Sequence, residues 1–303
     1  MSTPAPAAAL TAPVSGPDRD RIAWRLAEIA CAAGEILRGH HGGDCPHVIK
    51  PDGSPASLAD EESEAFILAA LGASWPGVPV VAEETGCQAQ IRDLYFLVDP
   101  LDGTRDYLAG SQQYAVCICL LDGARPIASA LAAPGLFRVW GAGTGAFEAS
   151  IRAGRPGDAH PIAVRAAPSD GLVALVSRRH GDSDTDACLD RLPIADRHVA
   201  SSAIKFGLIA AGEADLYVRC APTMEWDTAA GDHLVTVAGG CVVDPGGGPV
   251  TYGHRDRSYR NGPFAALGSP DYAGRLDLPR ASPRSYFDRR RAGEVIADAS
   301  QDA

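Results

Sequence analysis

The chain of 303 residues is long enough for one large domain or two of moderate size, and 46% of its residues are hydrophobic. Its formal net charge of −11 argues against binding to a nucleic-acid polymer, which requires a basic surface, but a small anionic substrate remains compatible. The sequence has no run of about 18 apolar residues and so predicts no transmembrane helix, which leaves at most peripheral contact with a membrane.

The cysteines and the N-terminus indicate the cellular compartment. The eight cysteines are scattered and form no C-x-x-C pair, which is typical of reduced thiols in a cytosolic protein. Cys117 and Cys119 lie two apart in an apolar run and are expected to point into the core from one face. Residues 1–17 lack the basic start and apolar centre of a signal peptide, so we expect a disordered tail and a cytoplasmic protein.

The first predicted element is an amphipathic helix from Asp18 to Arg38, where apolar residues recur at helical spacing. The histidine- and cysteine-containing residues 40–47 match no common zinc pattern and are interpreted as a surface loop. Ser57 and Asp60 have the spacing of a capping box, which opens a helix that extends to about Leu71. On local sequence alone, capping explains Asp60.

A short strand over Val78–Ala82 ends in two acids, Glu83 and Glu84, which in isolation would be a solvated strand end. The same arrangement recurs in the most informative stretch of the chain. There the apolar run from Leu94 ends in Asp99-Pro-Leu-Asp102-Gly-Thr104. An apolar run of this length, bounded by turn residues, favours a buried strand with both acids at its end.

The two carboxylates of this stretch, Asp99 and Asp102, would repel each other unless a cation lies between them. A divalent metal fits, because such ions prefer oxygen ligands. Gly103 allows close approach of the backbone, and the free amides of a helix starting near Thr104 would favour a phosphate. The stretch by itself therefore predicts a metal-assisted phosphatase.

The next residues predict an antiparallel meander. Its strands are Tyr114–Leu121, Pro126–Ala133 after a hairpin turn at Asp122-Gly123, Leu136–Trp140 and Ala146–Ala149. The glycines of residues 141–145 lie between strands with no helix after them, which argues against a dinucleotide-binding loop. The segment from Ile151 to Asp170, rich in Arg, Gly, Pro and Ala, is the best candidate for a domain boundary.

Beyond this segment strands and helices alternate, which predicts a small α/β layer. The predicted strands are Leu172–Val176, Ala214–Val218 and Cys241–Val243, and the predicted helices are Thr185–Leu192, Ser202–Ala211 and Trp226–Ala238. From about Leu276 we expect a peripheral helix or disorder. Asp227 stands at a helix start, where capping would be a sufficient explanation for it.

Taken together, Asp99-Pro-Leu-Asp102-Gly-Thr104 and the distant Trp226-Asp227 resemble the paired signature of the magnesium-dependent, lithium-sensitive phosphatases of the inositol monophosphatase superfamily. The resemblance spans roughly Ile22 to Ser269. Four flanking segments are most similar to the 3′(2′),5′-bisphosphate nucleotidase branch. They are Lys50-Pro-Asp-Gly-Ser-Pro, Pro79-Val-Val-Ala-Glu-Glu84, Ser201-Ser-Ala-Ile-Lys205-Phe and Pro222-Thr-Met-Glu-Trp-Asp-Thr-Ala-Ala-Gly231.

The resemblance implies an α/β (α+β) fold, a layered αβαβα sandwich with a large antiparallel N-terminal sheet and a smaller C-terminal α/β layer. The metals would lie at the strand ends of an N-terminal part, residues 18–155. A C-terminal part, residues 165–275, would close over the substrate. Residues 1–17 and 276–303 would be tails.

The resemblance also implies roles for single residues. The ligands of two or three Mg²⁺ ions would be Glu83, Asp99, the main-chain carbonyl of Leu101, Asp102 and Asp227. The catalytic residues would be Asp60, Thr104 and Glu83, with Asp60 paired to the Thr104 hydroxyl to help activate the attacking water. Glu84 would lie behind the metal ligands. The substrate would contact Asp102, Gly103, Thr104, His180, Lys205 and Asp227.

The activity implied is hydrolysis of adenosine 3′,5′-bisphosphate to AMP and phosphate. Two alternatives remain: an inositol- or sugar-phosphate phosphatase of the same superfamily, and a catalytically silent homologue that acts by binding. The expected partner is a small phosphate monoester rather than a nucleic-acid polymer, and a homodimer is compatible with the sequence.

Overall fold

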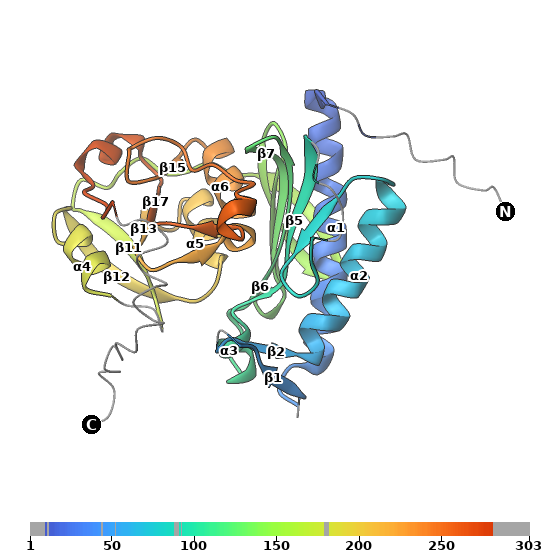
Figure 1. Ribbon diagram of the computed structural model, residues 1–303. Helices are drawn as coiled ribbons and strands as arrows, with labels where there is room; N and C mark the ends of the chain where they lie inside the picture. Colours follow the sequence, from blue (N-terminus) through green and yellow to red (C-terminus); the bar gives the residue numbers. More distant parts are fainter. Residues whose placement is uncertain are drawn as a thin grey trace.

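The computed structural model describes residue 10 and residues 12–43, 45–51, 53–87, 91, 93–178 and 182–280. These residues form alternating layers of helix and sheet (Figure 1). Three buried clusters of apolar side chains hold the layers together: one under the two N-terminal helices, one between the two main sheets and one under the helix at the opposite end. The predicted αβαβα sandwich is confirmed.

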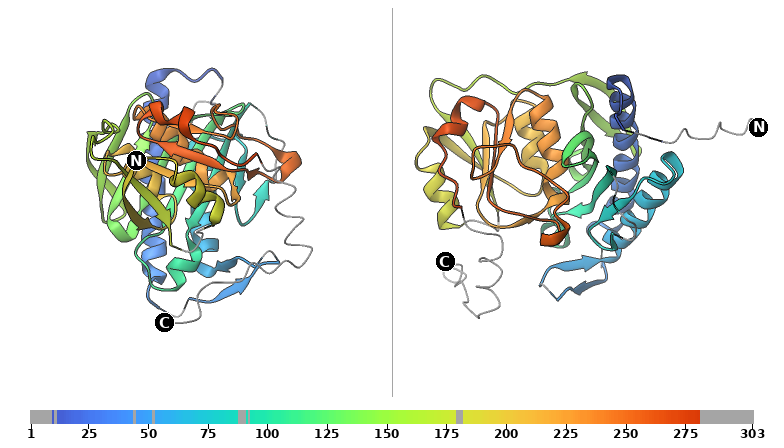
Figure 2. Two further views of the ribbon diagram at one scale, coloured as in Figure 1. Left: turned by 90° about the vertical axis from the view of Figure 1, so that its left-hand side faces the viewer. Right: turned by 45° about the horizontal axis from the view of Figure 1, so that its top comes forward.

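The outer helical layer consists of α1 (Gly16–His40) and α2 (Leu58–Ser74), which pack together on one side of the molecule in the right-hand view of Figure 2. The predicted capping box opens α2, because Ser57 N donates to Asp60 Oδ2 at 2.8 Å and Asp60 N donates to Ser57 Oγ at 3.4 Å. Ahead of it, β1 (His47–Ile49) and β2 (Pro55–Ser57) form a small antiparallel hairpin. No helix in the described part is long and apolar enough to cross a membrane.

The large sheet has the strand order β10-β9-β8-β7-β6-β5-β3-β4. Its strands are β3 (Val80–Ala82), β4 (Gly86–Cys87), β5 (Leu94–Asp102), β6 (Ala115–Asp122), β7 (Arg125–Ala133), β8 (Arg138–Ala142), β9 (Ala146–Arg152) and β10 (Arg155–Pro161). All neighbours pair antiparallel except β3 and β5, which run parallel. The predicted hairpin at Asp122-Gly123 is confirmed, since Asp122 pairs with Arg125.

The prediction from the sequence differs from the structure at several places in this sheet, and it does not include the two-residue strand β4. The predicted strand from Leu136 begins only at Arg138, because Pro134–Leu136 form a 3₁₀ turn. Strand β10 was not predicted, and it lies inside the segment interpreted as a domain boundary. Its residues carry no apolar alternation because it is an exposed edge strand, where Pro156 and Pro161 are tolerated.

The smaller sheet has the order β12-β11-β13-β17-β15. Its strands are β11 (Leu172–Ser177), β12 (Ile194–Ala200), β13 (Leu216–Arg219), β15 (Cys241–Val243) and β17 (Phe264–Leu267), and β14 (Thr223–Met224) pairs separately with β16 (Arg260–Asn261). The sequence did not predict β12 or β17. Strand β12 lies at the sheet edge and carries the exposed polar residues Asp196, Arg197 and His198, and β17 is only four residues long.

Two helices fill the space between the sheets, α5 (Ile204–Ala210) and α6 (Glu225–Val237), while α4 (Ser183–Leu189) covers the far side of the smaller sheet. The contact is close because glycines stand where the helices meet large rings. A Cβ at Gly207 would come within 2.7 Å of the Trp140 ring, and one at Gly231 within 2.2 Å of Phe206. Helix α5 therefore packs closely against β8 of the large sheet, and α6 packs closely against α5.

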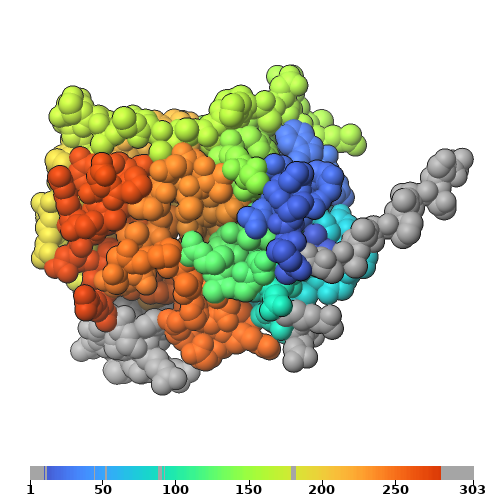
Figure 3. All heavy atoms as spheres, turned by 90° about the horizontal axis from the view of Figure 1, so that it is seen from above, coloured from blue at the N-terminus to red at the C-terminus, as the bar shows by residue number. Residues whose placement is uncertain are grey.

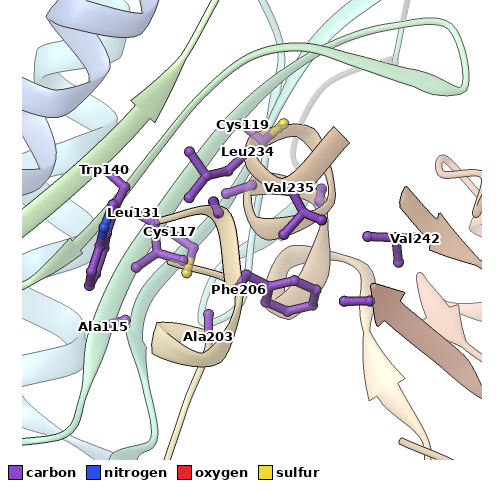
Figure 4. Close-up of a cluster of buried hydrophobic side chains, with 14 of the residues drawn as sticks. Ala115, Cys117, Cys119, Leu131, Trp140, Ala203, Phe206, Leu234, Val235 and Val242 are labelled. Carbon is purple, nitrogen blue, oxygen red and sulfur yellow. The ribbon is translucent and has the colours of Figure 1, made fainter. Parts of the chain in front are cut away.

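The core between the sheets contains Cys117 and Cys119 from β6, with Phe206 and Leu234 opposite them (Figure 4). Both cysteines are buried in this one cluster, as predicted. Along one side of the molecule, a segment that includes β10 and residues 162–171 spans both halves (yellow-green in Figure 3). Val164 N in this segment donates to Ala238 O at the end of α6, at 3.0 Å.

Candidate metal centre and active site

Strand β5 carries two carboxylates at its C-terminal end. Asp99 pairs with Cys117 of β6 and Asp102 pairs with Ala115, so three steps along β5 match two along β6. This is a β-bulge, which bends the strand end and redirects its side chains. Pro100 lies in the bulge, where its missing amide hydrogen breaks no ladder bond.

A third carboxylate arrives from the start of α6. Asp227 lies in the first turn of this helix and its Oδ2 accepts a hydrogen bond from Met224 N at 2.9 Å. The helix begins at Glu225, so Asp227 caps the helix from within the first turn rather than from the N-cap position. Carboxylate oxygens of Asp99, Asp102 and Asp227 lie within 4.8 Å of one another. In the described part of the chain, no other group of three or more potential metal-ligating side chains is this close.

The electrostatics of the three acids fit a hard divalent cation. Burial raises the pKa of Asp99 well above its usual range, and the negative charges of Glu83 and Asp102 raise it further. Burial, followed by the charge of Asp102, raises the pKa of Asp227 to about 7. Carboxylates that oppose each other's ionisation in this way become a favourable oxygen donor set once a cation shares them.

Glu83 extends the cluster from the end of β3. Its Oε1 accepts a hydrogen bond from Lys50 Nζ at 3.0 Å, and the same ammonium lies 2.6 Å from Glu84 Oε1. Burial raises the pKa of Glu83 to about 8; the ammonium of Lys50 opposes the shift and the charge of Asp227 adds to it. Glu83 is therefore electrostatically part of the acid cluster and not a free, solvated strand end.

The turn that carries Glu83 is held by a residue that sequence reasoning missed. The Glu64 carboxylate is 1% exposed and accepts Glu84 N at 2.9 Å and Thr85 N at 2.8 Å. The signal was present in the sequence, because Glu64 follows Asp60 by four residues and so shares its helix face. An acid on the buried face of a helix requires a partner.

Asp60 and Thr104 are paired as the resemblance implied. Thr104 Oγ1 lies 3.1 Å from Asp60 Oδ1 and 3.0 Å from the carbonyl oxygen of Leu101. Asp60 is fully buried, and its Oδ2 also accepts the amide and the hydroxyl of Ser57. Burial raises the pKa of Asp60, while the hydrogen bonds from Ser57 and Thr104 favour its ionised form. Capping and pairing are thus compatible in one side chain.

The start of α3 (Thr104–Leu108) depends on a glycine. Gly103 has φ +91°, a left-handed conformation that glycine adopts without strain. A Cβ there would also come within 3.2 Å of Ser202 Cβ, so the C-terminal part approaches the backbone closely at this point.

Two cations act electrostatically on Asp102, the buried Lys205 and the partly exposed Arg219. Lys205 is 2% exposed and donates to the carbonyls of Ala200 at 3.2 Å and Ser202 at 2.8 Å. Arg219, at the end of β13, was not singled out from the sequence, although it is the one charged residue of that strand. Burial raises the pKa of Asp102, and the charges of Lys205 and Arg219 oppose this shift.

The base of α6 is anchored by a second missed acid, Glu225. Its carboxylate is fully buried and accepts Gly253 N at 2.6 Å, His254 N at 3.0 Å and a ring nitrogen of His254 at 2.8 Å. These bonds fix the segment after β15 against the turn that carries Asp227.

The structure thus brings most of the predicted site residues to one place, namely Asp60, Glu83, Asp99, Leu101, Asp102, Gly103, Thr104 and Asp227. Lys205 lies immediately behind this group with its ammonium used by main-chain carbonyls. His180 lies outside the described residues. Of the residues that the structure describes in the 40–47 loop, none belongs to the cluster.

Comparisons with known proteins agree with this geometry. A family model for the inositol monophosphatase family matches residues 19–267. The 3′(2′),5′-bisphosphate nucleotidase CysQ of Escherichia coli (strain K12) is 32% identical over 240 residues, which cover 77% of this chain and 94% of that protein. The CysQ of Haemophilus influenzae (strain ATCC 51907 / DSM 11121 / KW20 / Rd) is 29% identical over 252 residues, 75% of this chain and 86% of its own.

Solved structures show the same architecture. The crystal structure of CysQ from Bacteroides thetaiotaomicron superimposes with a TM-score of 0.69 at 27% identity and covers 82% of this chain and 97% of that one. An inositol monophosphatase from Zymomonas mobilis shares the fold with a TM-score of 0.65 at 22% identity, over 86% of this chain and 97% of its own. The chain therefore belongs to the inositol monophosphatase family and is a phosphatase of that family.

Proposed function

We propose that the protein is a Mg²⁺-dependent phosphomonoester hydrolase that converts adenosine 3′,5′-bisphosphate to AMP and phosphate. The observation that carries the proposal is the convergence of Asp99, Asp102 and Asp227 within 4.8 Å, beside the Asp60–Thr104 pair. The choice of substrate follows the names of relatives up to 32% identical, which are 3′(2′),5′-bisphosphate nucleotidases.

The proposed ligands of two or three Mg²⁺ ions are Glu83, Asp99, the Leu101 carbonyl, Asp102 and Asp227. Bound Mg²⁺ would offset the negative charge of the cluster, so that an anionic ester can approach, and would lower the pKa of an attacking water. The protein's contribution is to hold the oxygens in place. Leu101 N, for example, donates to Asp99 Oδ1 at 3.0 Å and orients this carboxylate.

The Asp60–Thr104 pair would position the attacking water. A threonine hydroxyl has one proton, and when that proton points to Asp60 Oδ1 the lone pairs of Oγ1 can accept a hydrogen bond from water. As Oγ1 takes the proton of the water, the hydroxyl proton would pass to the Asp60 carboxylate. The two hydrogen bonds from Ser57 keep the Asp60 carboxylate in the orientation that this arrangement needs. The acceptor side of Thr104 is therefore the proposed site of general-base assistance.

The phosphate would lie at the main-chain amides of Gly103 and Thr104, next to Asp102 and Asp227. We further propose that Lys205 and His180 bind the rest of the substrate. Residues 18–155 would then supply the metal-binding part and residues 165–275 the substrate part, with the site between them. We keep the cytoplasm as the proposed location because all eight cysteines are free thiols.

The test is a comparison of kcat/KM on adenosine 3′,5′-bisphosphate and inositol 1-phosphate in Mg²⁺. Sedimentation velocity on the same sample shows whether the protein is a homodimer. We expect the bisphosphate to be the better substrate. Equal or better turnover of the inositol ester would replace the nucleotidase assignment by an inositol-phosphate phosphatase. If the protein released no phosphate from any monoester tested, the remaining alternative would be a catalytically silent homologue that acts by binding.

A further inference from the structure

The turn between β12 and α5, residues 201–203, is tied to the N-terminal part by three hydrogen bonds. Ser201 N donates to Gln113 Oε1 at 3.0 Å, and the Ser201 hydroxyl donates to Asp106 Oδ2. Ala203 N donates to Asp102 Oδ2. Two of these acceptors, on Asp106 and Gln113, belong to no proposed metal or substrate contact. We name Ser201, Asp106 and Gln113 the Ser201 latch.

The latch fixes a turn with an unfavourable backbone conformation. Ser202 has φ +61°, in the left-handed region that residues with a Cβ seldom occupy. The amides on either side of it, those of Ser201 and Ala203, are both held by the N-terminal part. The turn is also held within its own half of the chain, because Lys205 Nζ donates to the carbonyls of Ala200 and Ser202. Such a conformation persists only where the surroundings determine it.

The latch is shielded from water and lies beside the site. Ser201 is 3% exposed and Asp106 is 7% exposed, so solvent competes little for their hydrogen bond. The turn also touches the phosphate-binding side, because a Cβ at Gly103 would come within 3.2 Å of Ser202 Cβ. A displacement of the turn would therefore move the neighbours of Gly103 and the support of Lys205.

We propose that Asp106 and Gln113 are positioning residues. Through Ser201 they hold the 201–203 turn, and with it Lys205, at a fixed position relative to Asp102 and Gly103. The inference rests on the proposed phosphatase function and adds residues that touch neither metal nor ester. Loosening the latch raises KM for the ester, because the C-terminal part then meets the substrate in several arrangements. The Mg²⁺ concentration for half-maximal activity changes less, because Glu83, Asp99 and Asp227 are held by other contacts.

The test uses the full chain and the variants Ser201→Ala, Asp106→Ala and Gln113→Ala. We expect KM to rise about tenfold in each of the first two, the scale of a lost hydrogen bond to a charged group, with kcat changed much less. Asp106→Asn keeps an acceptor oxygen and should restore KM. The KM of the double variant S201A/D106A should be little higher than that of either single variant, because each single substitution already removes the same hydrogen bond.

The matched control is Thr236→Ala, which removes another hydroxyl-to-carboxylate bond, 3.0 Å to Asp232 Oδ1, away from the turn. It should lower stability without changing KM. A second readout, independent of activity, is hydrogen–deuterium exchange at the Ser201 and Ala203 amides without ester. Exchange should be slow in the wild type and faster in S201A and D106A.

The outcomes separate the two claims. If the wild-type protein hydrolyses no monoester, the proposed function is wrong. The hydrogen–deuterium exchange measurement then tests by itself whether the Ser201 latch holds the turn. Active wild type with unchanged KM and unchanged exchange in S201A and D106A overturns the latch. A KM increase of the same size in Thr236→Ala also overturns it, since the effect would then be one of general stability.

Discussion

Thr104 and Asp60 lie 44 residues apart in the chain, and their side chains meet at 3.1 Å. The bond joins the start of α3, at the end of β5, to the first turn of α2. It therefore places a buried carboxylate behind a hydroxyl that borders the three-acid cluster. The account of water activation depends on this pair.

Replacing Thr104 by Ala should lower kcat by about 100-fold or more, the scale of losing a positioned acid–base group, while KM changes less. Thr104→Ser keeps the hydroxyl and should retain most of kcat. The measurement is steady-state phosphate release at saturating Mg²⁺. If T104A and T104S had equal kcat values, the hydroxyl would have no part in the reaction.

A substitution at the N-cap of α2 should lower the stability of the protein much more than its kcat. Ser57→Ala removes the Ser57 hydroxyl, which donates to Asp60 Oδ2 at 2.6 Å and accepts Asp60 N at 3.4 Å. Loss of an N-cap side chain costs about 1 kcal/mol in the free energy of unfolding, measurable by urea denaturation. The kcat of S57A should fall much less than that of T104A, because the Asp60–Thr104 bond remains.

Glu64→Gln should raise the Mg²⁺ concentration for half-maximal activity by about tenfold, the lower end of the effect of removing an outer partner of a metal ligand. The reason is that one amide of the Glu84-Thr85 pair then faces an NH₂ group instead of an acceptor oxygen. Glu62→Gln, on the exposed side of α2, is the control and should leave this value unchanged. Equal Mg²⁺ dependence in both variants would show that Glu64 does not position Glu83.

Asp232→Asn should stabilise the protein at neutral pH. Burial raises the pKa of Asp232 to about 6, so the folded state prefers its protonated form. The stability that Asp232 contributes is therefore complete below its unfolded pKa and is lost as pH rises through about 6. Asn stays neutral at every pH. Its amide oxygen can accept a hydrogen bond from one of the hydroxyls of Tyr252 and Thr236, and its NH₂ group can donate to the other.

The advantage of D232N in free energy of unfolding should reach about 2–3 kcal/mol at pH 7 and disappear near pH 4. Urea denaturation at several pH values measures it. Asp196→Asn is the control, because Asp196 is exposed and its pKa is lowered by the hydrogen bond with His198. A constant difference between D232N and the wild type across this pH range would contradict the assignment.

The three acids of the cluster could be predicted from the sequence because their signals are local. An apolar run that stops at Asp99 and Asp102 indicates a buried strand end, and Trp226-Asp227 marks a helix start. What the local pattern could not decide was whether Asp60 and Asp227 only cap helices. Both do accept hydrogen bonds at a helix start, and both also contact the site.

The residues that were missed depend on contacts distant in sequence. Glu64 binds amides 20 and 21 residues away, and Ser201 meets Asp106 across 95 residues, so no short pattern reveals either bond. The strands β10 and β12 were missed because exposed edges lack the apolar alternation that identifies strands. Lys205 was predicted at the substrate, and the structure adds its role in holding the Ala200 and Ser202 carbonyls.

The most direct test of the central claim is phosphate release from adenosine 3′,5′-bisphosphate by the wild type and by Asp99→Asn, each with Mg²⁺ and with EDTA. Asp20→Asn, which alters a surface acid bonded to Thr144, controls for general effects of removing a charge. The account predicts that the wild type and D20N release phosphate only with Mg²⁺, and that folded D99N releases almost none. Undiminished release by D99N, or by the wild type in EDTA, would contradict it.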